Sequence, residues 1–235
     1  MRKLLYILPV LSLLASCKEE EKPKVIYEDS KVQEVKKDSS QIKVADLPIH
    51  MEGTKYLLHA IGDVQVAYER GSYGSVKTNV GSYALSNYNS FELTGYFQNI
   101  KFQHVDSTSL RPLTNKNVQI QTATYLNTIA TKTKKQILVY SLVDSDTNRD
   151  GKIDANDIKS LYISDFNGMR FQKLSGELHE LIDWNIIDSL NRLYFRTIED
   201  INKNGAFDKK DKMHYHYVNL ISDEWKVEDY SPIEG

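Results

Sequence analysis

The sequence of 235 residues has a single cysteine, so no disulfide bond can form within the chain. Its formal net charge is only −2, which excludes the broad basic field of a typical nucleic-acid-binding protein. The apolar run at residues 4–15 is shorter than the roughly 20 residues that a transmembrane helix needs. The remaining composition, 40% hydrophobic and 26% charged, is that of an ordinary globular protein.

Several enzyme motifs are also absent. The sequence has no nucleophile elbow with a Ser-His-Asp order, no HExxH zinc motif and no P-loop. The glycine-containing residues 71–75 lack the lysine and the following helix of a phosphate-binding loop. Glu177, Glu180 and Asp183 follow Gly176 in a stretch that could form a short helix, but no nucleophile accompanies them. We therefore expect a solvated acidic surface there, and no enzyme.

The N-terminus has the pattern of an export signal. Arg2 and Lys3 precede the apolar residues 4–15, whose length suits the central part of a signal peptide. The motif Leu14-Ala15-Ser16-Cys17 follows and resembles the lipobox of bacterial lipoproteins. The resemblance implies cleavage before Cys17 and acylation of its thiol and new amine, so that lipid on Cys17 attaches the mature protein to a membrane.

Residues 1–16 are thus expected to be a lipoprotein signal peptide and residues 17–48 a flexible, lipid-anchored linker. The linker is rich in Lys, Glu, Asp and Ser, a composition that buries too little apolar surface to fold. Its one apolar spot, Val25-Ile26-Tyr27, receives no role. Lys18-Glu19-Glu20-Glu21 resembles the surface-export signal of some Gram-negative lipoproteins, with a charged spacer as the alternative. The expected location is the outer membrane of the cell envelope, facing the periplasm or the surface.

From residue 49 onward the sequence favours β-structure, and its 15 tyrosines agree with this. Residues 55–61 and 63–69 are predicted to form two strands with a turn at Gly62-Asp63. The other predicted strands are residues 82–85, 90–94, 96–105, 119–129, 136–143, 158–164, 171–174, 193–198 and 213–220. We expect residues 49–235 to form one all-β repeat domain.

Residues 146–157, between two of these strands, have the pattern of a calcium-binding loop. Oxygen-bearing side chains occupy loop positions 1, 3, 5, 9 and 12, and glycine occupies position 6, where the sharp turn needs a positive φ. The pattern resembles EF-hand loops, and its final aspartate resembles dockerins. It implies a calcium site with side-chain ligands Asp146, Asn148, Asp150, Asp154 and Asp157 and the backbone carbonyl of Lys152 at position 7.

The predicted flanking strands decide between two roles for this loop. In sensors of the calmodulin type, the loop lies between two amphipathic helices that open when calcium binds. Here the loop is expected to connect strands, with Ile153 at position 8 pointing into a core, which favours a structural role. The alternative is an Asp- and Gly-rich surface turn that binds no calcium.

Residues 200–211 repeat the pattern together with its strands, because Tyr140 and Tyr194 lie at the same distance before the two loops. The second loop offers three carboxylates against four in the first, since Asn204 occupies position 5, and Phe207 at position 8 is bulky. We expect it to bind calcium more weakly, or to be a turn that has lost the ion. Its implied ligands are Asp200, Asn202, Asn204, Asp208, Asp211 and the carbonyl of Ala206.

A looser repeat relates residues 100–107 with Leu113-Thr114 to residues 161–168 with Leu174-Ser175. This unit of strand, turn and strand is similar to the outer part of TolB-like propeller blades. Repeats of about 55–60 residues would give roughly three blades, fewer than the four that a propeller normally needs. The expected fold is all-β, built from repeated antiparallel β-meanders as an incomplete propeller, a sandwich or a stack.

Two histidines suggest a further metal site. His214 and His216 lie two residues apart on a predicted strand, so both point to one face and could bind a transition metal. No third ligand is identifiable from the sequence. The alternative is an exposed face, with Tyr215 and Tyr217 pointing into the core.

These patterns predict a lipid-anchored envelope protein in which calcium holds strand-connecting loops in place. The alternative is an envelope accessory module that binds a protein or glycan partner, for which Trp184, Trp225 and the tyrosines are candidate contacts. A hydrolase with an unrecognised site is a further alternative. No nucleic-acid partner is expected.

Overall fold

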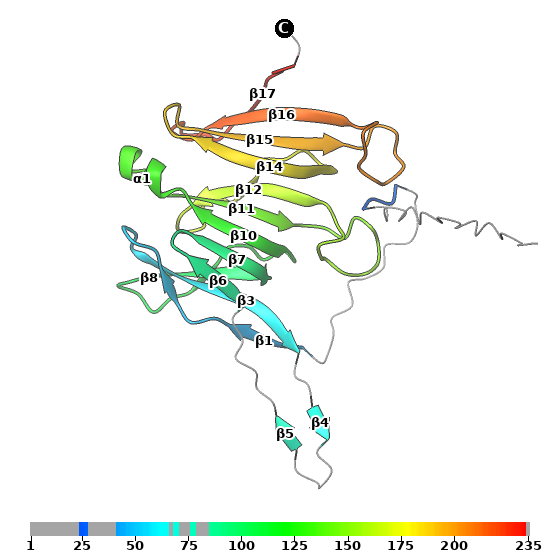
Figure 1. Cartoon of the computed structure of the whole chain (residues 1–235). Coiled ribbons are helices and arrows are strands. Elements are labelled where there is room, and N and C mark those ends of the chain that lie inside the picture. Colours follow the sequence, from blue (N-terminus) through cyan, green and yellow to red (C-terminus); the bar gives the residue numbers. More distant parts are fainter. Residues whose placement is uncertain (1–23, 28–40, 66–67, 71–75, 79–84, 234–235) are drawn as a thin grey trace, which may run out of the picture.

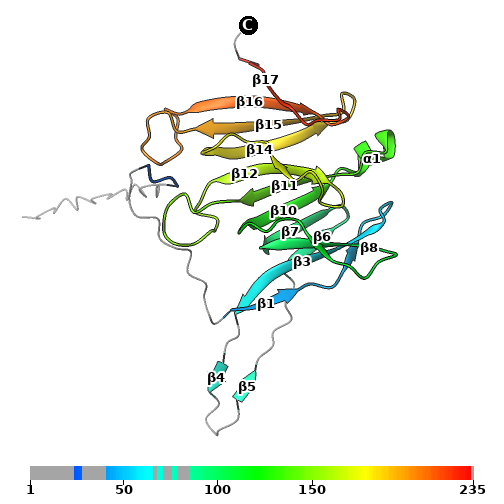
Figure 2. The same cartoon turned by 180° about the vertical axis from the view of Figure 1, so that it is seen from behind.

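The computed structural model describes residues 24–27, 41–65, 68–70, 76–78 and 85–233 (Figures 1 and 2). Antiparallel strands dominate this part of the chain, and its one helix is α1 (Asn127–Thr133). The predicted all-β class is therefore confirmed. The expected signal peptide, Cys17 and residues 71–75 lie outside the described residues. Among those described, no helix is long and apolar enough to span a bilayer.

Two four-stranded antiparallel meanders contain the predicted calcium loops. The first consists of β10 (Gln119–Tyr125), β11 (Ile137–Val143), β12 (Lys159–Asp165) and β13 (Gln172–Lys173). The second consists of β14 (His179–Ile187), β15 (Arg192–Glu199), β16 (Lys212–Asn219) and β17 (Val227–Asp229). Each loop joins the second strand of its meander to the third, so the predicted repeat of loop and strands is present in the structure.

The N-terminal strands extend the first meander and add a further sheet. β6 (Ser86–Asn89) and β7 (Glu92–Phe97) continue the first meander beyond β10. A separate sheet contains β1 (Gln41–Ala45), β2 (Ile49–His50), β3 (Tyr56–Gln65), β8 (Asn99–His104) and β9 (Arg111–Pro112). β4 (Tyr68–Arg70) and β5 (Val76–Thr78) form a two-stranded ribbon below it in Figure 1.

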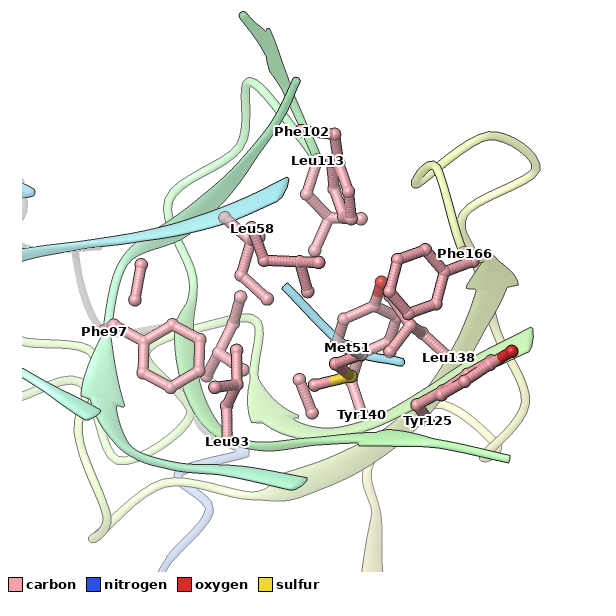
Figure 3. Packing of buried hydrophobic residues seen from close by; sticks show 14 of the residues in the cluster. Met51, Leu58, Leu93, Phe97, Phe102, Leu113, Tyr125, Leu138, Tyr140 and Phe166 are labelled. Atoms are coloured by element: carbon pink, nitrogen blue, oxygen red, sulfur yellow. The ribbon is translucent and has the colours of Figure 1, made fainter. Parts of the chain in front are cut away.

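The three larger sheets stack as layers, and β11 lies in the middle layer (Figures 1 and 2). Every residue of β11 is buried, because its two faces serve two cores. Leu138 and Tyr140 belong to one hydrophobic cluster with residues of β3 and β8, part of which Figure 3 shows. Ile137 and Val139 belong to the other cluster, which includes residues of β15 and β16. An uninterrupted apolar strand is the pattern that burial on both faces requires.

The looser upstream repeat is also present. The β8–β9 hairpin and the β12–β13 hairpin both pair antiparallel, and a corresponding hydrogen bond follows each. The N–H of Leu113 donates to the carbonyl of Ile100 at 2.9 Å, and the N–H of Leu174 donates to the carbonyl of Leu161 at 2.8 Å. The sequence likeness thus corresponds to a shared local geometry.

Several predicted elements were wrong, and for two of them the cause is pairing with another strand. β3 continues through Gly62 and Asp63, since β1 pairs with these residues and removes the need for a turn there. β1 itself lies inside the expected linker. The strand predicted at residues 119–129 ends at Tyr125, and α1 follows. Residues 177–183 form no helix, because β14 pairs with β15 along its whole length.

Gly168 is a position where the sequence is tightly constrained. Its φ of +74° is left-handed, and a Cβ added there would overlap the ring of Phe102 on β8. We expect Gly168→Ala to cost about 2–4 kcal/mol of folding free energy, or roughly 5–12 °C in Tm. Gly53→Ala is the control, because Gly53 has a similar φ of +81° but no atom within 4 Å of the added Cβ. Equal losses for the two variants in thermal unfolding would contradict the steric argument.

Candidate calcium-binding loops

The two predicted loops lie at the same end of the stacked sheets (Figures 1 and 2). The first connects β11 to β12 and the second connects β15 to β16, so both join neighbouring antiparallel strands. The predicted strand flanks are therefore confirmed. A loop held between two hydrogen-bonded strands has no pair of helices to open, unlike the loop of a calcium sensor.

Asp157, at position 12, is the most buried carboxylate of the first loop, with a solvent exposure of 0%. Its Oδ1 accepts hydrogen bonds from the backbone N–H groups of Thr147 at 2.8 Å and Asn148 at 3.1 Å. Its Oδ2 accepts from the N–H of Asp154 at 3.0 Å. Burial nevertheless raises the pKa of the Asp157 carboxyl above its usual value, against these hydrogen bonds. A bound cation would favour the charged form of this group.

The first half of this loop, residues 146–152, folds around its own side-chain oxygens. Asp146 accepts backbone hydrogen bonds from Asp150 at 3.1 Å and from Gly151 at 2.9 Å. Asn148 Oδ1 also accepts from Asp150, at 2.9 Å, and Asp150 accepts from Lys152 at 2.9 Å. Gly151 has a φ of +83°, as position 6 requires. The side chains at positions 1, 3 and 5 are thus gathered by backbone donors within one tight turn.

The second loop repeats these bonds. Asp200 accepts from the N–H of Gly205 at 2.7 Å, and Gly205 has a φ of +82°. At the far end, Asp211 Oδ2 accepts from the N–H of Asp208 at 2.8 Å. Asn202 and Asn204 accept the corresponding bonds at positions 3 and 5. The two loops therefore share these hydrogen bonds as well as their sequence pattern.

The loops differ in which aspartate is buried. In the second loop the position 1 carboxylate of Asp200 is buried, whereas Asp211 at position 12 is half-buried. Asp211 accepts one backbone N–H, and the amide of Asn202 donates to its other oxygen at 3.3 Å. At position 8, Ile153 and Phe207 are both half-buried, so neither lies fully within a core as was expected for Ile153.

A segment near the N-terminus, the apolar spot within the expected linker, joins the two loops. The N–H groups of Lys24 and Val25 donate to the carbonyl of Gly205 in the second loop, at 2.7 and 3.1 Å. The N–H of Ile26 donates to the carbonyl of Thr147 in the first loop at 2.9 Å, and the Thr147 hydroxyl donates to the carbonyl of Lys24 at 2.7 Å. Val25 is buried. The expected linker is therefore fixed to both loops over residues 24–27.

Two further side chains hold this segment. The Lys24 ammonium pairs with Glu180 at 2.9 Å, and Glu180 also accepts the backbone N–H of Lys159 at 2.8 Å. Burial, together with the charge of Asp200 and a hydrogen bond to it, raises the pKa of Tyr27 to about 12. Glu180 is thus a buried anchor, which corrects the solvated acidic surface expected there.

Val25→Asp is expected to release the segment from the loops, because a charge cannot be buried at this site without a partner. We expect the backbone N–H of Ile26, which donates to the carbonyl of Thr147, to exchange with solvent at least about tenfold faster in the variant, since the segment would no longer be held. Hydrogen exchange followed by mass spectrometry measures the rate. Exchange in the unchanged chain at the variant's rate would show that the segment does not dock.

Asp144, which precedes the first loop, is occupied by other partners. It accepts from the hydroxyl of Tyr162 at 2.7 Å and pairs with Lys173 at 2.8 Å. Burial opposes ionisation, but hydrogen bonds from Lys173 and Tyr162 outweigh it, so the pKa of Asp144 is lowered. This carboxylate fixes the base of the loop and is not needed as a ligand.

The two candidate histidines lie on β16, which follows the second loop. His214 and His216 do share a face, but it is the inner one, since His216 is buried while Tyr215 and Tyr217 are half-buried. The predicted histidine pair is therefore incomplete as a site, because Thr197 and Asp229 already occupy the two nitrogens of His216.

Three of the remaining candidates, two of them acidic and one aromatic, have local partners. Asp183 pairs with Arg196, and the exposed Glu177 pairs with Lys173. Trp225 is buried, with the guanidinium carbon of Arg170 4.0 Å from the centre of its ring. It therefore lines no groove.

Comparison with known proteins gives no independent assignment. A scan against protein-family models found no match, and a search of curated proteins found none.

Proposed function

We propose that this protein binds calcium at both loops and that the ions fix the strand connections of its two meanders. One observation carries the proposal. The same twelve-residue arrangement of oxygens occurs at the same strand connection in both meanders, and in both loops position 1 accepts from the glycine at position 6 and position 12 accepts from position 9. Two surface turns of unrelated origin have no reason to agree in ligand spacing, glycine position and place in the fold.

Calcium would counter a cost that the first loop otherwise carries. Four carboxylates lie within residues 146–157, and one of them, Asp157, is buried. Like charges at this spacing repel, and burial adds a desolvation cost. Calcium takes six to eight oxygens, which residues at positions 1, 3, 5, 7, 9 and 12 would supply. The ion would thereby hold the charged forms in place and tighten the link between strands.

We further propose that lipid on Cys17 brings the loop end of the molecule close to the membrane. Lys24 is seven positions after Cys17 and is hydrogen-bonded to the second loop. Seven residues span at most about 25 Å when fully extended. The docked segment therefore shortens the tether, and the folded part cannot stand away from the membrane by the whole length of residues 17–48.

Removal of calcium tests the proposal. If each site has a Kd of about 0.1 mM, as extracellular modules do, millimolar calcium adds roughly 1.5–2 kcal/mol per site. We expect the Tm of the mature protein to be roughly 5–10 °C higher in millimolar calcium than in EGTA. Magnesium at the same concentration is the control, because it prefers a smaller octahedral shell and keeps its waters. A Tm that does not respond to calcium would rule the proposal out.

A further inference from the structure

Three metal-ligating side chains meet on neighbouring strands of the second meander, outside both loops. They are His179 at the start of β14, Glu199 at the end of β15 and His214 near the start of β16. His179 lies opposite Glu199 in the sheet, and His214 lies opposite Thr197, so all three share one face. One ligand atom from each lies within 4.8 Å of the other two.

We propose that His179, Glu199 and His214 form a zinc-class transition-metal site. Glu199 Oε2 is 2.8 Å from His214 Nε2 and 3.9 Å from His179 Nε2. In a tetrahedral zinc site with bonds of about 2.0–2.2 Å, ligand atoms lie roughly 3.3–3.5 Å apart. The two observed distances fall on either side of this value, so small side-chain rotations would bring both to the spacing of a tetrahedral site. Two imidazoles and one carboxylate suit zinc, whereas calcium prefers oxygen ligands alone.

A chain of hydrogen bonds prepares His179 for this role. The Asp229 carboxylate accepts from His216 Nδ1 at 2.6 Å, which leaves His216 Nε2 as an acceptor. The hydroxyl of Thr197 then donates to His216 Nε2 at 3.1 Å, and its oxygen accepts from His179 Nδ1 at 3.3 Å. With its proton on Nδ1, His179 presents a lone pair at Nε2, the atom that faces Glu199. Such a partner behind a ligating histidine is the usual support of a metal site.

The site is accessible and supplies three protein ligands. The side chains of His179 and His214 are 19% and 21% exposed, and that of Glu199 is 43% exposed. Solvent can therefore reach the metal and complete a tetrahedral shell, as in zinc sites with an open position. Glu199 immediately precedes the second calcium loop, but it occupies none of that loop's ligand positions.

Zinc titration of the mature, lipidated chain in millimolar calcium tests the site, because calcium then occupies the loops. We expect one zinc ion per chain with a Kd of about 1 μM or below, measured by calorimetry. Cobalt in place of zinc should give the intense visible absorption of a four-coordinate ion. Zinc binding weaker than about 100 μM, or a six-coordinate cobalt spectrum, would overturn the proposal.

Matched variants locate the binding. His179→Gln and His214→Gln should each weaken zinc binding at least about a hundredfold, whereas His50→Gln, an exposed histidine on β2, should leave it unchanged. Thr197→Val should weaken it by about 10–100-fold and Thr197→Ser should preserve it, because only serine keeps the hydroxyl. Unchanged affinity in His179→Gln, or equal losses in both Thr197 variants, would contradict the assigned geometry.

Discussion

Asp157→Ala is expected to lower the Tm by roughly 10–15 °C even when calcium is absent. The Asp157 carboxylate is fully buried and accepts the backbone N–H groups of Thr147, Asn148 and Asp154. Alanine leaves these donors without partners and leaves a cavity beside them. Losses of this kind cost about 3–5 kcal/mol, which corresponds to such a shift in a chain of this size. Thermal unfolding in EGTA measures it.

Asp150→Ala separates this structural role from calcium binding. Asp150 is exposed and accepts one backbone hydrogen bond, from Lys152 at 2.9 Å. We expect a loss below about 1 kcal/mol in EGTA, because an exposed N–H can bond to water. In calcium, the variant should lose the part of the Tm increase that the first loop provides. If Asp157→Ala were no more harmful in EGTA than Asp150→Ala, the hydrogen bonds of Asp157 would not hold the apo loop.

The features predictable from sequence are those that local patterns encode. Strands beside the two loops follow from short apolar runs, and the loops follow from oxygen and glycine spacing within twelve residues. The repeat was visible because whole units of loop and strands recur. These features depend on neighbours in the chain, so no distant contact was needed to infer them.

The features that were missed depend on contacts between distant residues. Val25 is buried, and the backbone around it is hydrogen-bonded to Gly205 and Thr147, far along the chain. Its signal was an apolar spot in a charged stretch, which composition alone assigned to a linker. β3 likewise runs through Gly62 because β1 lies beside it.

The histidines of β16 likewise show that contacts between distant residues cannot be inferred from the sequence. Alternation along β16 placed His214 and His216 on one face, but it could not say that this face is the inner one. The other two ligands of the proposed site, His179 and Glu199, come from two other strands. Strand register decides which residues meet, and register depends on pairing across the sheet. The sequence therefore indicated one residue of the proposed site, His214, and paired it with His216, whose two nitrogens have other partners.

Charge at position 5 provides the sharpest comparison between the two loops. Asp150 and Asn204 occupy this position, both are exposed, and the Oδ1 of each accepts the backbone N–H two residues later, at 2.9 and 2.8 Å. Asp150→Asn and Asn204→Asp should therefore change charge while keeping this hydrogen bond. Because calcium affinity rises with the number of carboxylates, each substitution should alter its own loop's Kd by about tenfold.

Exchanging the two residues should then reverse the order of the sites. In the unchanged chain we expect the first loop to bind calcium more tightly, whereas in the double variant Asp150→Asn/Asn204→Asp the second loop should be the tighter one. The ratio of the two constants would change by about a hundredfold. Calorimetry with one loop silenced, by Asp146→Ala or Asp200→Ala, assigns each constant. If the first loop stayed tighter after the exchange, the buried Asp157 rather than carboxylate number would govern affinity, since burial differs between the loops at position 12.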